Sequence, residues 1–247
     1  MVRRIWKAKA MPAELDRALT EFFASEFWKA VEKGYGVTLE DVDFTSPDYE
    51  MLRKLEQSVY QFASAKNYQQ LKAISQALLD EAGKLRTFSA FRLAASEINN
   101  QFVNQWLQAE YNYAVASSQM ASRWIQIQEN KETLPLLRYD TVGDERVRLE
   151  HQELEDVVRP VDDSFWDVYY PPNGWNCRCD VVQLDSGTIT PLEKISLPDK
   201  MPDLFKYNSG KKGMAFPPGH PYYDGLPDTI KRQGNDIWIS KRVNKNK

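Results

Sequence analysis

The chain has 247 residues, which is enough for one large domain or two smaller ones with a buried core. Hydrophobic residues make up 42% of the sequence and aromatic residues 12%, and this composition excludes an intrinsically disordered chain. The formal charge of -3, from 32 basic and 35 acidic side chains, excludes a global positive field that would hold nucleic acid.

Cysteine content and hydropathy indicate where the chain is made. Its two cysteines cannot form the disulfide framework of a secreted protein, and residues 1–20 lack an apolar stretch of signal-peptide length. A membrane-spanning helix needs about 18 consecutive apolar residues, and the sequence contains no such run. We therefore expect synthesis in a reducing bacterial cytoplasm and no membrane partner.

Proline and glycine are distributed unevenly along the chain. Residues 1–130 hold two of the 13 prolines and three of the 11 glycines. Because both residue types interrupt regular structure, this predicts an α+β chain: a long-helix region over 1–130, then a compact, turn-rich mixed α/β domain over 131–240. Residues 241–247 are predicted to form a basic tail.

Two helices are predicted before residue 84. The first is expected to begin at Pro12, which suits a first helical turn, and to end near Gly34. For the second, Ser46 is a favourable N-cap and Pro47 a favourable first residue, with Gly83 as the expected stop.

A third apolar stripe runs from Phe91 to Ile127 with a mean spacing of 3.6 residues, the period of an α-helix. It predicts a helix from about Phe88 to Gln128 that would be about 60 Å long at 1.5 Å per residue. Two interpretations stay open: an arm that contacts partner proteins, or a core helix of a bundle with a kink.

The second half opens with an apolar segment, 134–139, that predicts a strand. Asp144 is placed to cap a short helix carrying His151, and 176–184 predicts a second strand.

All cysteines and histidines of the chain lie in this second half: His151, Cys177, Cys179 and His220. Thiolate and imidazole are preferred zinc ligands, and Cys2His2 is the composition of a closed structural site. In a strand, Cys177 and Cys179 would point to one face and could reach one metal ion. The residue inventory therefore predicts a structural zinc site, although the spacing is not a specific zinc signature.

Two other interpretations of these residues stay open. Both thiols could be small buried side chains and both histidines structural. Alternatively, Cys177 or Cys179 could be a nucleophile activated by His151, with Arg178 as the neighbouring positive charge. Phosphate-binding, nucleophile-elbow and zinc-protease motifs are absent from the sequence.

Three strings taken together carry a family resemblance: DERVRLEH around His151, DDSFW at 162–166, and PPNGWNCRC at 171–179. Their order and spacing resemble the bacteriophage Mu F-like family of minor head, or head morphogenesis, proteins. The resemblance covers about residues 130–225. Five residues match family positions, and the match does not settle their roles: His151, Trp175, Cys177, Arg178 and Cys179.

The resemblance implies a structural protein of a phage or prophage head, located in the virion head. Its partners would be the portal and capsid proteins, with homo-oligomerisation as a further option. It implies a protein that is not an enzyme; the alternative is a Cys/His-dependent hydrolase or transferase delivered with phage DNA.

A weak, non-specific contact with DNA is a further possible property of the chain. It would use the basic tail and the N-terminal basic residues, which are Arg3, Arg4, Lys7 and Lys9.

Overall fold

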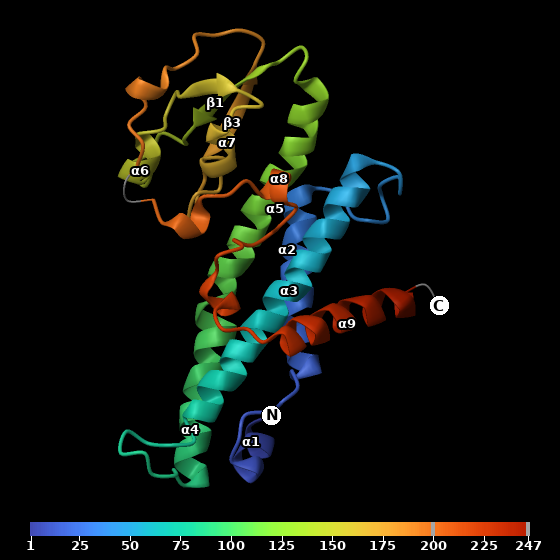
Figure 1. Ribbon diagram of the computed structural model, residues 1–247, viewed down its shortest axis with the longest axis vertical. Coiled ribbons are helices and arrows are strands. Elements are labelled where there is room, and N and C mark those ends of the chain that lie inside the picture. The colour runs from blue at the N-terminus through green and yellow to red at the C-terminus, as the bar shows by residue number, and fades with distance from the viewer. Residues whose placement is uncertain (199–200, 246–247) are drawn as a thin grey trace. The chain divides into compact units, whose positions relative to one another are not determined.

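The computed structural model describes residues 1–198 and 201–245, and Figure 1 shows its elements. The α-helices are α1 (Val2–Ala8), α2 (Arg17–Tyr35), α3 (Pro47–Gln76), α4 (Phe88–Asn100), α5 (Leu107–Asn130), α6 (Leu149–Gln152), α7 (Phe165–Val168), α8 (Ser209–Lys212) and α9 (Asp228–Lys245). The strands are β1 (Leu136–Asp140), β2 (Val158–Pro160) and β3 (Asp180–Leu184). Long helices in the first half and a small sheet in the second confirm the predicted α+β class.

Contacts divide the chain into two compact units that are each built from separate segments. The first unit contains residues 1–27, 59–110 and 221–247, and the second contains 28–58 and 111–220. The linear division into 1–130, 131–240 and 241–247 stays a prediction. Residues 241–245 continue α9, and 246–247 lie outside the described residues. No helix in the described part of the chain has both the length and the apolar character needed to cross a membrane.

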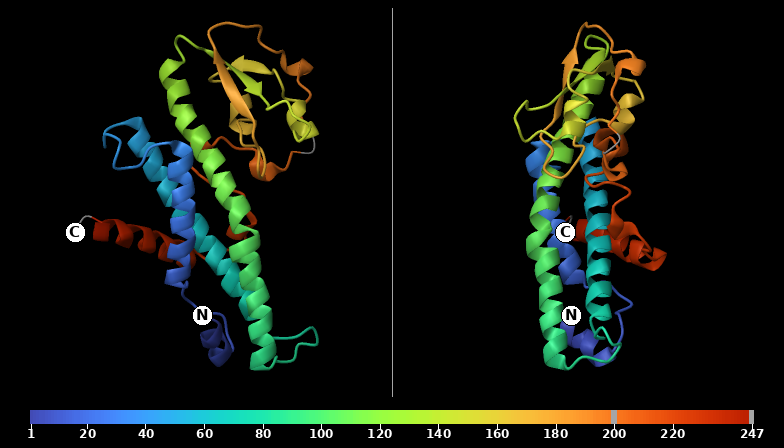
Figure 2. Two further views of the ribbon diagram at one scale, coloured as in Figure 1. Left: turned by 180° about the vertical axis from the view of Figure 1, so that it is seen from behind. Right: turned by 90° about the vertical axis from the view of Figure 1, so that its left-hand side faces the viewer.

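The first unit has an apolar core in which α1 packs against α4 (Figure 2). The ring of Trp6 stacks on that of Phe91 with centroids 5.6 Å apart. Ile5 is fully buried together with Leu71 and Ile74 of α3. This short helix was missed in the sequence because seven residues are too few to show a clear period.

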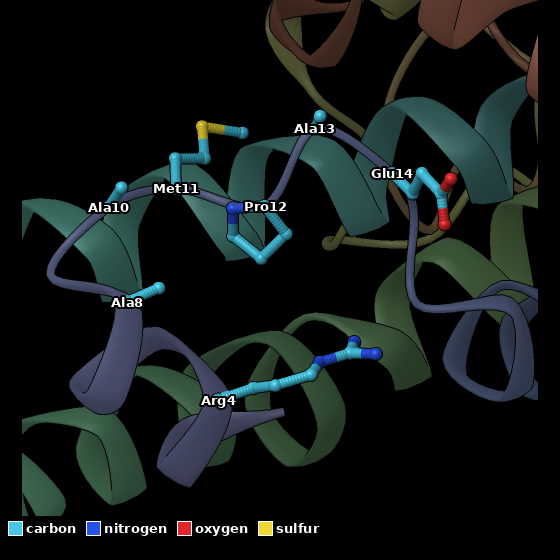
Figure 3. Close-up of a pocket in the computed structure, with 7 residues that line it drawn as sticks. All are labelled: Arg4, Ala8, Ala10, Met11, Pro12, Ala13 and Glu14. Carbon is cyan, nitrogen blue, oxygen red and sulfur yellow. The ribbon is translucent and has the colours of Figure 1, made fainter.

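The predicted start of the first long helix at Pro12 is wrong. α2 begins at Arg17, because the Asp16 carboxylate accepts a hydrogen bond from the backbone N–H of Leu19 at 3.3 Å, as an N-cap does. Pro12 lies instead in the segment that joins α1 to α2. This segment and Arg4 line an open pocket of about 300 Å³ (Figure 3).

The predicted start of the second helix is confirmed, whereas its predicted end is wrong. The hydroxyl of Ser46 accepts a hydrogen bond from the N–H of Tyr49 at 3.1 Å, and α3 begins at Pro47. The helix ends at Gln76, and Gly83, with a φ of +75°, lies in the following turn. Asp80 holds that turn by accepting hydrogen bonds from two backbone N–H groups, a local alternative to helix.

The third predicted helix is interrupted rather than continuous. A π-helical segment, Gln101–Gln105, separates α4 from α5, and the N–H of Trp106 donates to the carbonyl of Gln101 at 3.0 Å. The apolar stripe is nevertheless buried, at Phe91 in the first unit and at Trp124 in the second. The interruption and the buried part of the stripe agree with the core-helix interpretation, and contact of this helix with partner proteins stays a prediction.

The second unit contains a three-stranded antiparallel sheet in the order β2-β1-β3. β1 confirms the strand predicted near 134–139. Asp140 at its end pairs with Asp180, the first residue of β3. A core of large side chains packs around the sheet and α5, with Trp166 and Tyr170 completely buried. The indole N–H of Trp166 donates to the carbonyl of Pro160 at 3.0 Å, so its polar edge is satisfied.

Within the second unit, the last turn of α2 approaches the backbone of α5 closely. A Cβ atom on Gly34 would lie 2.1 Å from the carbonyl oxygen of Val115. The absence of a side chain at Gly34 permits this approach.

Candidate metal centre

Two local elements of the second unit bring three potential ligands together. His151 lies on the short helix α6, while Cys177 and Cys179 lie in the turn that precedes β3. The strand predicted from residue 176 therefore starts too early. Asn176 has a left-handed φ of +55°, and the N–H of Cys177 donates to the carbonyl of Gly174 at 3.1 Å, so this segment is a turn.

Both sulfur atoms nevertheless face the same imidazole, as the metal hypothesis requires. Nδ1 of His151 lies 3.7 Å from the Sγ of Cys177 and 3.4 Å from the Sγ of Cys179. All three ligand atoms lie within 4.8 Å of one another. Zn–S and Zn–N bonds at a tetrahedral angle would separate sulfur from nitrogen by about 3.5 Å. The observed separations fit a zinc ion bound by these three residues.

The three ligand residues are largely removed from solvent. His151 is 2% exposed and Cys177 is 8% exposed, while Cys179 is partly buried. The Nε2 atom of His151 is buried and has no hydrogen-bond partner among the described residues. Few hydrogen bonds therefore hold this buried imidazole in place: its Nδ1 faces the two sulfurs, and its Nε2 faces no partner in the described part of the chain.

The two thiols differ in acidity because they share a hydrogen bond. The pKa of Cys177 falls to about 4, chiefly because Cys179 donates a hydrogen bond to its sulfur and, next, because His151 lies beside it. The hydrogen bond to Cys177 and burial raise the pKa of Cys179. Without a metal ion the pair therefore resembles one thiolate and one thiol, and binding zinc through both sulfurs would release the remaining proton.

Asp144 does not cap α6, contrary to the prediction. The N-cap residue of that helix is Arg148, without a side-chain hydrogen bond. The carboxylate of Asp144 instead accepts two hydrogen bonds from the guanidinium of Arg178, each 2.7 Å long. This contact holds the pKa of Asp144 at about 2. Arg178 therefore ties the cysteine turn to the loop before α6, which gives a physical role to one residue of the family-like string.

Trp175 and His220 lie beside the centre in a different arrangement. The Trp175 ring meets Tyr113 edge-on at 5.0 Å and His220 edge-on at 5.9 Å. His220 is not part of the group formed by His151, Cys177 and Cys179. The structure thus brings together three of the four predicted zinc ligands, and coordination by His220 stays a prediction.

A small pocket adjoins the centre and reveals residues that the sequence interpretation missed. Its volume is about 20 Å³, and Arg146, Arg148 and Arg178 contribute to its lining. Arg148 donates a hydrogen bond to the carbonyl of Trp175 at 2.6 Å. The DERVR string, which contains Arg146 and Arg148, was the available sequence signal for these residues. The sequence does not show, however, toward which group the side chain of an arginine near His151 points.

A second buried polar cluster, in the first unit, was also missed. Nζ of Lys66 lies 2.8 and 2.6 Å from the two carboxylate oxygens of Glu110. The hydroxyl of Tyr222 donates to the same carboxylate at 2.8 Å. The ring centroids of four aromatic residues lie within 6.0 Å of this ammonium group: Phe23, Phe102, Trp106 and Tyr222.

Burial acts against both charges of this pair. It lowers the pKa of Lys66 and raises the pKa of Glu110, and in each case the partner charge opposes the shift. Because the charges are paired and hydrogen-bonded, the cluster satisfies itself and offers no open ligand position.

Comparison with known proteins identifies relatives over part of the chain. A family model described as "Phage Mu protein F like protein" matches residues 53–182. The "Putative capsid assembly protein F" of Escherichia phage Mu is 39% identical over 82 residues, which cover 33% of this chain and 19% of the relative. The "Mu-like prophage FluMu F protein" of Haemophilus influenzae is 42% identical over 64 residues, covering 26% of this chain and 16% of the relative.

These alignments span less than a fifth of the length of either curated relative. No solved structure matches the chain. The matched family segment includes His151, Cys177 and Cys179, together with β1, β2 and the start of β3.

Proposed function

Because this chain belongs to the Phage Mu protein F like family, we propose that it takes part in assembling the head of a phage or prophage. The observation that carries the proposal is the match over 53–182, which spans residues of both compact units. The name of the phage Mu relative, a capsid assembly protein, indicates the same role. The protein is expected in the virion head, acting as a structural protein rather than an enzyme.

The proposed partners are the portal and shell proteins of the same phage. Exposed apolar side chains on the second unit support docking of this kind: Leu149 is 74% exposed and Val142 is 48% exposed, close in sequence to the metal centre. Such side chains lose water when a partner covers them, which is the main driving force of protein association.

The test is co-sedimentation of the full chain with cognate shell and portal proteins under assembly conditions. We expect the chain to move into the particle fractions of a density gradient when shell and portal proteins are present. Leu149→Glu should reduce this association, whereas Leu192→Glu, at a side chain that is 59% exposed in a short 3-10 helix after β3, should not. A chain that stays at the top of the gradient in every combination of partners would contradict the proposal.

We also propose that the chain makes a weak contact with packaged DNA. Helix α1 carries three exposed basic side chains, those of Arg3, Arg4 and Lys7, and the exposed Lys9 directly follows the last residue of the helix. Asp16 lies 3.6 Å from the guanidinium of Arg4, so part of this charge is already compensated. We expect weak binding without sequence preference, with log affinity falling by about 0.9 per phosphate contact for each unit of log salt concentration.

The DNA contact is tested by fluorescence anisotropy with a labelled duplex over a range of salt concentrations. Replacing Arg3 and Lys7 with serine should flatten the salt dependence. Binding that does not change with salt, or that is unaffected by these substitutions, would argue against an electrostatic contact through α1.

A further inference from the structure

We propose that His151, Cys177 and Cys179 form a zinc centre with three protein ligands, whose fourth coordination position is filled from solvent. This goes beyond the proposed role in head assembly and does not depend on it. It also departs from the closed four-residue site that the sequence suggested, because the ligand count comes from the geometry.

The donor set selects the metal. Two thiolates and one imidazole form a soft, nitrogen-containing set that favours zinc over magnesium or calcium, which prefer oxygen ligands. The separations of 3.7 and 3.4 Å between Nδ1 of His151 and the two sulfurs suit three corners of a tetrahedron around zinc. Among the described residues, no fourth histidine, cysteine or carboxylate joins this group.

The pocket beside the ligands supplies the fourth position. Its volume of about 20 Å³ accommodates one water molecule, since a water needs at least about 10–15 Å³ of such space. His151, Cys177 and Cys179 are all part of its lining. A solvent molecule there would lie next to all three ligands, whereas a substrate of ordinary size would not fit.

The charges around this pocket favour a ligand that carries negative charge. Arg146, Arg148 and Arg178 line it. The single carboxylate of Asp144 pairs with two of them, with Arg178 at 2.7 Å and with Arg146 at 3.5 Å, so positive charge remains in excess. The fourth ligand is therefore water in the free protein, and a small anion can replace it because the remaining positive charge stabilises the anion. The position is exchangeable, unlike that of a closed structural site.

His220 is the alternative fourth ligand, but the structure places it outside the ligand group. Its ring lies edge-on to Trp175 with centroids 5.9 Å apart, and its backbone N–H donates to the carbonyl of Pro217 at 3.1 Å. The imidazole is 7% exposed and packs beside the cysteine turn without entering the ligand group. His220→Ala is therefore the variant that separates a three-ligand centre from a four-ligand centre.

The first measurement is metal content of the purified full chain by mass spectrometry, for the wild type, His220→Ala and His151→Ala. We expect about one zinc ion per chain in the wild type and in His220→Ala, and loss of zinc in His151→Ala. Circular dichroism verifies folding. If His151→Ala does not fold, His151→Cys serves instead, because a third thiolate should retain zinc. Absence of zinc from the wild type, or its loss from His220→Ala alone, overturns the proposal.

The second measurement tests the exchangeable position. Zinc is replaced with Co²⁺, and the visible absorption of the loaded chain in chloride-free buffer is recorded while sodium chloride is added. We expect the cobalt bands to shift in a saturable manner, equally in the wild type and in His220→Ala, because the single-atom chloride ion displaces the solvent ligand in both. A cobalt spectrum that does not respond to chloride in the wild type means a closed site and overturns the proposal.

Discussion

The two buried polar clusters of this protein differ in how completely their polar groups find hydrogen-bond and charge partners within the cluster. In the first unit, Lys66 faces both carboxylate oxygens of Glu110, and Tyr222 donates to the same carboxylate. In the second unit, His151 faces two sulfurs, and its Nε2 has no partner among the described residues. One cluster pairs opposite charges, whereas the other gathers groups that all act as metal ligands.

This difference separates a structural role from a ligand-binding role. A paired ammonium and carboxylate stabilise each other and need nothing further. Two thiols and an imidazole in one buried place share hydrogen bonds, and all three are also groups that bind zinc in proteins. Burial alone therefore does not indicate a site; the chemistry of the neighbours does.

Removing the proposed zinc ion is expected to have the largest effect. Zinc contributes on the order of 10 kcal/mol of apparent binding free energy in zinc-finger peptides, so a chelator should destabilise the second unit and free both thiols. The measurement is thiol reactivity with a colorimetric disulfide reagent, before and after chelation, together with the thermal midpoint. Lys66→Met is the matched control, since it should leave the protection of the thiols intact. If the thiols react equally with and without chelator, they bind no metal ion, and the proposed difference between the two clusters is contradicted.

Breaking the charge pair should have the next largest effect. Lys66→Met leaves the carboxylate of Glu110 buried without a counter-charge, and such a change costs about 3–5 kcal/mol of unfolding free energy. Urea denaturation of the variant and the wild type measures the loss.

The double variant Lys66→Met, Glu110→Leu tests the cause of that loss. Because both charges are gone, we expect it to recover most of the stability. A double variant as unstable as Lys66→Met would mean that packing of the lysine stem, rather than the unpaired carboxylate, determines the effect.

Removing one hydroxyl from the same cluster should have a smaller effect. Tyr222→Phe deletes the donor to Glu110, and a hydrogen bond to a charged group contributes about 1.5–3 kcal/mol. The neighbouring Tyr223→Phe is the matched control, because the buried hydroxyl of Tyr223 has no hydrogen-bond partner among the described residues. We expect its unfolding free energy to equal or exceed that of the wild type. Similar losses in both variants would show that the hydroxyl of Tyr222 has no special role.

The smallest expected effect concerns the exposed pair formed by Asp144 and Arg178, beside the proposed zinc centre. The pKa of Asp144 is lowered from 3.8 to about 2, chiefly by the hydrogen bond from Arg178. Its stabilising contribution is therefore fully present above about pH 4 and is lost as the pH falls toward 2. Thermal midpoints of the wild type and Asp144→Asn should differ slightly at neutral pH and converge in acid. A difference that grows as the pH falls would reverse this sign.

Local features of the fold were predictable from sequence where a short pattern determines the structure. Ser46 and Pro47 begin α3 because capping needs only neighbouring residues. The convergence of Cys177 and Cys179 on His151 was also expected, although from a strand that the structure replaces with a turn. The left-handed Asn176 is the local cause, and no spacing rule indicates it.

Features that depend on distant contacts were not predictable. The 3.6-residue period continues through residues 101–105, so nothing in the sequence shows that the hydrogen bonds there are π-helical. Lys66 and Glu110 are 44 positions apart, and each resembles an ordinary surface charge in sequence. Asp144 was assigned to the nearest helix, whereas its partner Arg178 lies 34 positions away.

The close approach of α2 and α5 involves positions 34 and 115, and these two positions should differ in how many substitutions they tolerate. The obstacle to a side chain at position 34 is the backbone carbonyl of Val115, which every amino acid possesses. A saturation library should therefore accept only glycine at position 34, whereas position 115 can vary without affecting this contact. A second-site suppressor of Gly34→Ala would have to shift a helix axis, because no substitution at position 115 can supply the missing space.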